Sequence, residues 1–195
     1  MSNLSASVAA LAPLRPFASF TANLSDGVVT AAQLLLPHLE RGGRIDAVVL
    51  RAAMEHAFGG SDAAGAWDWK TAYDACEAAA VLFMRKFGLV IRARAGSPAA
   101  ELSMLSKIAA LLPTHTRRSE ESQALQQFST PLALGFVAAR AAAITPVDLV
   151  LEPSAGTGLL AIFAELAGSG LVLNELAETR AALLGQLFPS AATTR

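Results

Sequence analysis

The chain has 195 residues, of which 53% are hydrophobic and 16% are charged, and its formal net charge is -1. This length suffices for one large domain or two small ones, and the balanced charge gives no global basic field that would by itself indicate binding to nucleic acid. A single cysteine, Cys76, excludes a disulfide framework within the chain, and the three histidines lack metal-ligand spacing. No uninterrupted apolar run reaches the roughly 18 residues of a membrane span, and the start lacks the early basic residue of a signal peptide. We therefore expect a helix-rich cytoplasmic protein.

The first part of the chain predicts a helical region over residues 26–113, preceded by a loosely ordered lead-in over residues 1–25 that is rich in Ser and Ala. Apolar residues recur at helical spacing in four segments, which are residues 28–40, 45–58, 67–87 and 98–112. Pro37 should kink or end the first helix, and Gly88 should end the third. Ser97 should cap the fourth helix, because a hydroxyl cap followed by proline is typical of a helix start.

The third of these helices carries aromatic residues at steps of three and four, such as Trp69 and Tyr73, which predict a buried stripe. Asp74 and Glu77 on the same helix are expected to belong to its solvated face. Residues 114–127 are polar and of mixed charge, and we expect them to form a linker between two regions.

From residue 128 to residue 195 the pattern changes to alternating helix and strand. The predicted elements are a helix over 131–144, a strand over 148–151, a helix over 158–167, a strand over 171–174 and a helix over 178–188. Two strands joined by a helix form a βαβ unit, whose strands should be parallel. The predicted fold class is therefore α/β, with an N-terminal helical region followed by the first βαβ portion of an incomplete Rossmann-like sheet. Such a sheet would leave an open edge and favour self-association.

The most informative segment is a hydrophobic strand that runs into a glycine turn and opens a helix, Leu149-Val150-Leu151-Glu152-Pro153-Ser154-Ala155-Gly156-Thr157-Gly158. Glycines let the backbone pass close to a bound molecule, and a helix start offers it unsatisfied N–H groups. Gly156, Gly158 and Ala161 also fit the G-x-G-x-x-G/A spacing of dinucleotide sites, so a nicotinamide or flavin site is an alternative.

The carboxylate at the end of this strand favours a cationic ligand. Glu152 would face an anionic pyrophosphate at unfavourable energy, whereas the ammonium and sulfonium groups of S-adenosylmethionine are natural partners for it. Glu175 ends the next strand, where an acid can accept hydrogen bonds from both ribose hydroxyls. Glu175 therefore indicates a nucleoside ligand without distinguishing the two cofactors.

Three segments resemble, in order and spacing, the cofactor motifs of adenine-N6 DNA methyltransferases. Glu152-Pro153-Ser154-Ala155-Gly156-Thr157-Gly158 looks like their E-P-x-x-G-x-G motif, Asn174-Glu175-Leu176 looks like the acidic motif that follows, and Gln127-Phe128-Ser129-Thr130-Pro131 looks like the F-x-T-P segment that precedes both. The resemblance implies that Thr130 and Glu152 hold the methionine part of S-adenosylmethionine and that Glu175 holds the ribose. The cofactor-binding residues that it implies are Phe128, Thr130, Pro131, Glu152, Pro153, Ala155, Gly156, Thr157, Gly158, Glu175 and Leu176.

Two further stretches resemble the N-terminal region of large bacterial methylase/helicase proteins related to strawberry notch. They are Leu112-Pro113-Thr114-His115-Thr116-Arg117-Arg118-Ser119-Glu120-Glu121-Ser122 and Gly65-Ala66-Trp67-Asp68-Trp69-Lys70. In those proteins a helicase-like region follows, but the present chain contains no G-x-x-x-x-G-K-[ST] phosphate loop.

The same family orients the target amine with an Asn or Asp followed by two prolines and an aromatic residue. Neither Asn-Pro-Pro nor Asp-Pro-Pro occurs in the chain, so no catalytic residue is predicted. We therefore expect an S-adenosylmethionine-binding N-terminal portion of a DNA adenine-N6 methyltransferase/helicase-like protein, inactive alone, that reaches DNA through downstream regions. The alternatives are a non-enzymatic helical interaction module with a vestigial nucleoside pocket and an NAD-binding half domain.

Overall fold

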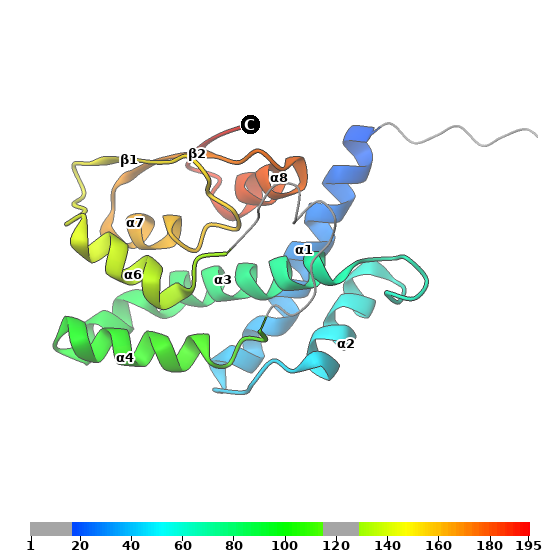
Figure 1. Cartoon of the computed structure of the whole chain (residues 1–195), viewed down its shortest axis with the longest axis horizontal. Coiled ribbons are helices and arrows are strands. Elements are labelled where there is room, and N and C mark those ends of the chain that lie inside the picture. Colours follow the sequence, from blue (N-terminus) through cyan, green and yellow to red (C-terminus); the bar gives the residue numbers. More distant parts are fainter. Residues whose placement is uncertain (1–16, 115–128) are drawn as a thin grey trace, which may run out of the picture.

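The computed structural model describes residues 17–114 and 129–195, with side chains from Leu24 onward. A small parallel sheet lies on one side of a layer of helices (Figure 1). The elements in chain order are α1 (Phe17–Glu40), α2 (Ala47–Phe58), α3 (Trp69–Ala95), α4 (Pro98–Ala109), α6 (Leu132–Ala141), β1 (Leu149–Glu152), α7 (Ala161–Ala167), β2 (Gly170–Asn174), α8 (Glu178–Leu187) and β3 (Ala192–Thr194).

The second and fourth predicted helices are confirmed, and so is the predicted cap at Ser97; α2 begins at Ala47, two residues after the predicted start. The Asp46 side chain accepts hydrogen bonds from the backbone N–H groups of Val48 and Val49, both at 2.9 Å, and so caps α2. Ser97 caps α4 in the same way, and Pro98 occupies the first turn of that helix. These starts depend on residues within one turn of each other, which is why the sequence locates them.

Predictions about the ends of the first and third helices were wrong. Helix α1 begins at Phe17, inside the segment expected to be loosely ordered. Pro37, which was expected to kink or end this helix, lies inside it and does not end it. Helix α3 continues past Gly88 to Ala95. A Cβ atom at Gly88 would lie 2.5 Å from Leu166 Cδ1 on α7, so this glycine permits close packing of α7 on α3 and does not end the helix.

The sheet has the strand order β1-β2-β3, and both strand pairs are parallel. The parallel pairing predicted for the first two strands is thus confirmed, with Leu149 opposite Gly170 and Glu152 opposite Leu173. The third strand follows α8 and was not predicted. The structure is therefore a mixed helical and sheet fold, and the larger Rossmann-like sheet stays a proposal.

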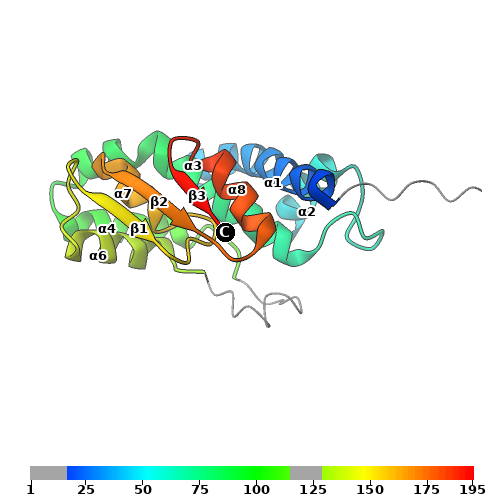
Figure 2. The same cartoon turned by 90° about the horizontal axis from the view of Figure 1, so that it is seen from above.

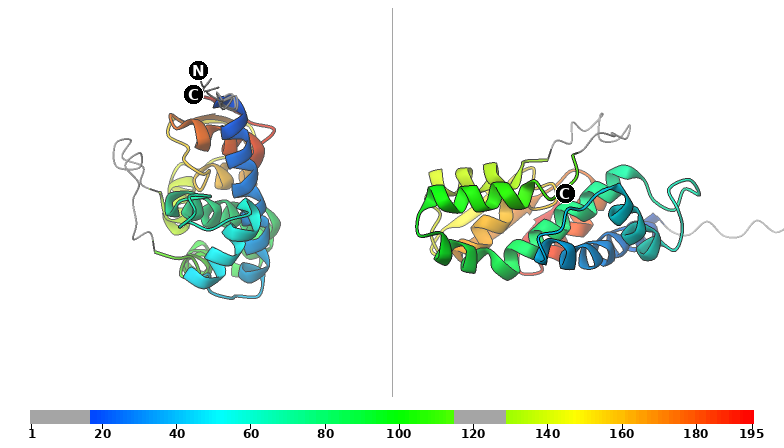
Figure 3. Two further views of the ribbon diagram at one scale, coloured as in Figure 1. Left: turned by 90° about the vertical axis from the view of Figure 1, so that its right-hand side faces the viewer. Right: turned by 90° about the horizontal axis from the view of Figure 1, so that it is seen from below.

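One face of the sheet is covered by helices and the other is not. Leu173 points to the covered face and is fully buried, whereas Leu149 and Leu151 on the opposite face are 72% and 63% exposed. Viewed from above, the strands have no element lying over them (Figure 2), and the helices form the layer on the other side (Figure 3). Parallel sheets normally have both faces covered, so this exposed face is unusual.

The buried hydrophobic residues of both predicted regions belong to one cluster, which extends from Val28 on α1 to Phe188 after α8. Polar contacts join the same elements. Arg85 on α3 forms a bidentate pair with Glu165 on α7, with N–O distances of 2.6 and 2.9 Å. None of the helices in the described ranges is long and apolar enough to cross a membrane.

Candidate functional site

The carboxyl ends of β1 and β2 place two acidic residues beside the glycine turn. Glu152 is the last residue of β1, and Glu175 directly follows β2. Because neighbouring parallel strands end at the same edge of a sheet, the two residues lie on either side of the turn that leads to α7. This juxtaposition is the one that the sequence motifs predict.

The turn requires glycine at two positions for different reasons. Gly156 and Gly158 both have a positive φ, +57° and +91°, which other residues rarely adopt. A Cβ atom at Gly158 would lie 2.2 Å from the ring of Phe188, so its missing side chain makes room for the core. A Cβ atom at Gly156 would meet nothing within 4 Å, which leaves the outer side of the turn open to a ligand.

Glu175 holds the turn in place. One of its carboxylate oxygens accepts a hydrogen bond from the Gly156 N–H at 2.9 Å, and the other accepts from the Ala177 N–H at 2.8 Å. The residue is only 7% exposed. Each carboxylate oxygen has lone pairs for more than one hydrogen bond, so Glu175 has acceptor capacity beyond these two N–H groups.

Glu152 is half-buried, and its Oε1 atom accepts a hydrogen bond from the Ser154 N–H at 3.3 Å. Among the described residues it forms no ion pair. No cation of the described part of the chain therefore neutralises its carboxylate charge. Such a group can accept a cationic ligand without first breaking an ion pair with a described residue.

Beneath the turn, Thr157 donates a hydrogen bond of 2.6 Å from Oγ1 to Glu77 Oε2 on α3. Glu77 is buried, and so is Asp74 one turn earlier, where Arg180 of α8 donates to it at 2.7 and 3.1 Å. The prediction that Asp74 and Glu77 belong to a solvated face was wrong, because the glycine turn and α8 pack on that side of α3 and supply Thr157 and Arg180 as partners. No local sequence pattern indicates this network, since Thr157 and Arg180 lie 80 and 106 residues from their partners.

The buried network changes the acidity of Glu77. Burial and the neighbouring Asp74 carboxylate raise its pKa to about 7, although hydrogen bonds from Ser129 and Thr157 and the charge of Arg180 lower it. Burial lowers the pKa of Arg180, but attraction to Asp74 outweighs this effect, so the guanidinium stays protonated. Glu77, which holds the turn through its hydrogen bond with Thr157, therefore titrates near neutral pH.

A small cavity of about 30 Å³ lies between the turn and the segment that precedes α6. Of the predicted site residues, Thr130, Ala155, Gly156 and Thr157 line this cavity. Ser129, Ser154, Leu159 and Leu160 also line it and were not predicted.

The remaining predicted residues lie around this cavity or outside the described ranges. Pro131 precedes α6 as its cap residue, and the Pro153 carbonyl accepts a hydrogen bond from the Asn174 side chain at 3.1 Å. Leu176 is 65% exposed at the end of the edge. Phe128 lies outside the described residues. The structure thus brings most of the predicted residues together at one edge, and it leaves the outer side of that edge exposed.

The residues at this edge fit the charge and hydrogen-bonding groups of S-adenosylmethionine. Two carboxylates match its ammonium and ribose hydroxyls, and an open glycine turn lies between them. The cavity beside the turn has room for about one or two water molecules, so it does not enclose a nucleoside. Comparisons of the chain with protein families, with curated proteins and with solved structures found no match.

Proposed function

We propose that the chain carries the S-adenosylmethionine-binding portion of a DNA adenine-N6 methyltransferase/helicase-like protein. The observation that carries the proposal is the placement of Glu152 and Glu175 on either side of a positive-φ glycine turn, at the carboxyl edge of two adjacent parallel strands. Ligands of open α/β sheets bind at the carboxyl ends of the strands. The acidic character of this edge favours a cationic nucleoside over a dinucleotide.

Each residue of the edge has a defined task in the proposal. Bound S-adenosylmethionine supplies an activated methyl group on its sulfonium. Glu152 pairs with the ammonium group of the methionine part, and Glu175 accepts from the ribose hydroxyls while it keeps the Gly156 N–H in place. Thr157 and Glu77 fix the turn from below, so that the backbone does not have to order when the ligand arrives.

Methyl transfer itself is not assigned to these residues, because the 195 residues contain neither Asn-Pro-Pro nor Asp-Pro-Pro. Recognition of DNA belongs, in this proposal, to regions that are not part of the sequence. The chain therefore acts as the cofactor-holding part of a larger assembly.

Two observations favour a second function, a helical interaction module with a vestigial nucleoside pocket. Both oxygens of Glu175 are already bonded to backbone N–H groups, and the cavity beside the turn, of about 30 Å³, is far below the roughly 300–1,000 Å³ of ligand pockets. In this second function the turn is a closed structural joint between β1 and α7.

Titration calorimetry distinguishes the two functions. The chain is titrated with S-adenosylmethionine and, separately, with NAD, and the titrations are repeated with Glu152→Gln and with the control Glu55→Gln on the exposed side of α2. We expect S-adenosylmethionine to bind with a Kd below about 1 mM and NAD not to bind. Glu152→Gln should weaken binding about tenfold, because it removes a charged hydrogen bond, and Glu55→Gln should not change it.

The absence of heat up to about 1 mM S-adenosylmethionine would remove the cofactor assignment and leave the interaction module. Tighter binding of NAD than of S-adenosylmethionine would favour the dinucleotide alternative instead.

A further inference from the structure

A second cavity, of about 250 Å³, lies at the other end of α6 from the glycine turn. Thr130 precedes α6 at the candidate cofactor site, whereas Arg140 in the last turn of α6 lines this cavity together with Arg92 of α3. A ten-residue helix is about 15 Å long, so the two places are separate.

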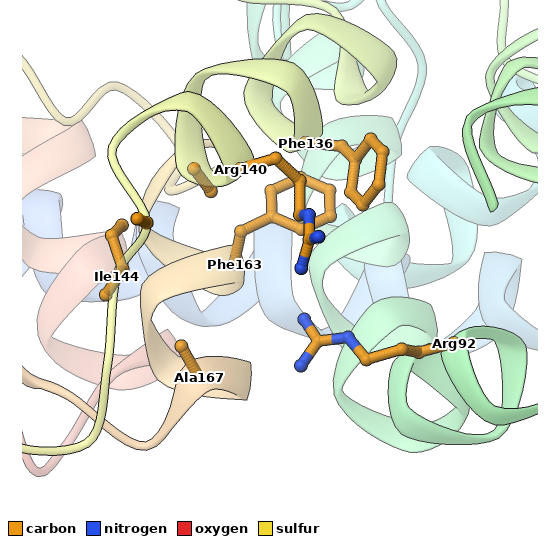
Figure 4. A pocket seen from close by; sticks show the side chains of 8 residues that line it. Arg92, Phe136, Arg140, Ile144, Phe163 and Ala167 are labelled. Atoms are coloured by element: carbon orange, nitrogen blue, oxygen red, sulfur yellow. The ribbon is translucent and has the colours of Figure 1, made fainter. Parts of the chain in front are cut away.

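The two arginines of this cavity come from different helices and point into the same space (Figure 4). The Arg92 Nε atom is buried and has no hydrogen-bond partner among the described residues. This nitrogen forms an ion pair with Glu101, whose Oε1 lies 3.7 Å away, beyond hydrogen-bond distance. Arg140 forms no ion pair with any described residue.

Two facing guanidinium groups repel each other, and together with Glu101 they leave the cavity with a net positive charge. Arg92 and Arg140 each lie in the last turn of a helix, where a cation is favourable. The favourable interaction of a cation with a helix C-terminus explains why each helix ends with an arginine. It does not explain why both arginine side chains point into one cavity. An oxyanion between the two groups would give Arg140 a charged acceptor and would give Arg92 a hydrogen-bond acceptor in addition to its ion pair with Glu101.

The wall of the cavity beside the arginines is aromatic. Phe136 of α6 and Phe163 of α7 meet edge to face, with ring centroids 6.0 Å apart, and both line the space (Figure 4). Ile144 adds apolar surface on the far side. A ligand that fills the cavity therefore has a charged end and an apolar, flat end.

We propose that this cavity binds a phosphate monoester carried on an aromatic group. A phosphate monoester carries about −1.5 to −2 charge at pH 7, which matches two guanidinium groups, and its oxygens can accept from both of them. Its aromatic part lies against Phe136 and Phe163. The site is independent of the S-adenosylmethionine assignment, because it shares no lining residue with the glycine turn.

Calorimetry on the whole chain with three probes tests the proposal. The probes are phenyl phosphate, inorganic phosphate and benzoate, and we expect phenyl phosphate to bind more tightly than either of the others. The Arg140 side chain is exposed at the helix surface. Arg140→Ala should weaken the binding of phenyl phosphate about tenfold or more, and Arg140→Lys should weaken this binding less. The control is Arg94→Ala, which removes an exposed charge from the same last turn of α3 without touching the cavity.

Thermal unfolding of each variant checks that folding is unchanged. The proposal is overturned if no probe binds at about 10 mM, or if Arg94→Ala weakens binding as much as Arg140→Ala. If inorganic phosphate binds as tightly as phenyl phosphate, the claim that the ligand carries an aromatic group is wrong. If benzoate binds more tightly than phenyl phosphate, the claim that its anionic group is a phosphate is wrong.

Discussion

Glu77 joins the long helix α3 to the glycine turn through one short hydrogen bond with Thr157. It does so from a buried position, one helical turn from the Asp74 carboxylate and near the Arg180 guanidinium. A buried carboxylate loses hydration, which favours its protonated form, and the neighbouring Asp74 charge adds to that effect. The position of the candidate cofactor turn therefore depends on a residue that titrates in the physiological range.

This acidity predicts a pH-dependent stability. In the folded chain Glu77 has a pKa of about 7, against an ordinary value of 4.5, so between these pH values the folded chain binds a proton that the unfolded chain releases. The contribution of Glu77 to the free energy of unfolding should therefore be highest below about pH 4.5. It should fall by about 3 kcal/mol as the pH rises to about 7. Glu77→Gln should remove this fall, because an amide does not titrate.

Urea unfolding of the chain and of Glu77→Gln at pH 5 and pH 8 measures the effect. The difference between the two proteins isolates Glu77 from the other titrating groups. An equal change of unfolding free energy with pH in both proteins would contradict the assignment.

At the scale of elements, α3 is the helix on which the others are arranged. It packs against α1, α4 and α7, and α8 reaches it through the Arg180–Asp74 pair. The contact with α7 depends on Gly88, where the side chain of Leu166 fills the space that a Cβ atom would need. Glycine weakens a helix by itself, so its presence here indicates that the packing contact outweighs the loss.

Two glycines inside helices allow a matched test of this contact. Gly185→Ala on α8 should stabilise the fold by about 0.5–1 kcal/mol, because nothing lies within 4 Å of that Cβ. Gly88→Ala should be less favourable than Gly185→Ala by about 1–3 kcal/mol, because its Cβ would lie 2.5 Å from Leu166 Cδ1, and that side chain must shift. Thermal unfolding of both variants gives the comparison. An equal gain in both variants would show that α7 does not pack on α3 as described.

For the molecule as a whole, the uncovered face of the sheet exposes apolar side chains beside an unpaired strand edge. Leu149 and Leu151 are largely exposed there, and Val147 just before β1 is 92% exposed. Strand β1 pairs with β2 on one side, and no described strand pairs with its other edge. Unpaired backbone groups next to apolar side chains are a template for association with another chain.

We therefore expect copies of the chain to associate through β1. Leu151→Lys should shift the chain toward monomer, because a charge on the exposed face opposes burial against a second copy. The control is Val48→Lys on α2, which also replaces an exposed apolar residue, 77% exposed, but lies away from the sheet. Light scattering across a range of concentrations measures the mass. A monomer at all concentrations, or an equal effect of both variants, would contradict association through β1.

The sequence by itself determined the features that depend on neighbouring residues. The cap Ser97, the parallel pairing of β1 with β2 and the glycine turn at Gly156 follow from local spacing, so they could be predicted. For the candidate site, this was enough to place Glu152 and Glu175 at one edge of the sheet.

Only the tertiary structure decided the features that depend on distant partners. Gly88 continues α3 because Leu166 packs on it, and Glu77 is buried because Thr157 reaches it from 80 residues away. The short strand β3 exists because β2 offers it an edge. Helical periodicity shows which side of a helix is apolar. A charged residue, however, can be buried only where the fold brings a hydrogen-bonding or charged partner to it. That partner lies far away in the sequence, so the pattern around the charged residue does not predict its burial.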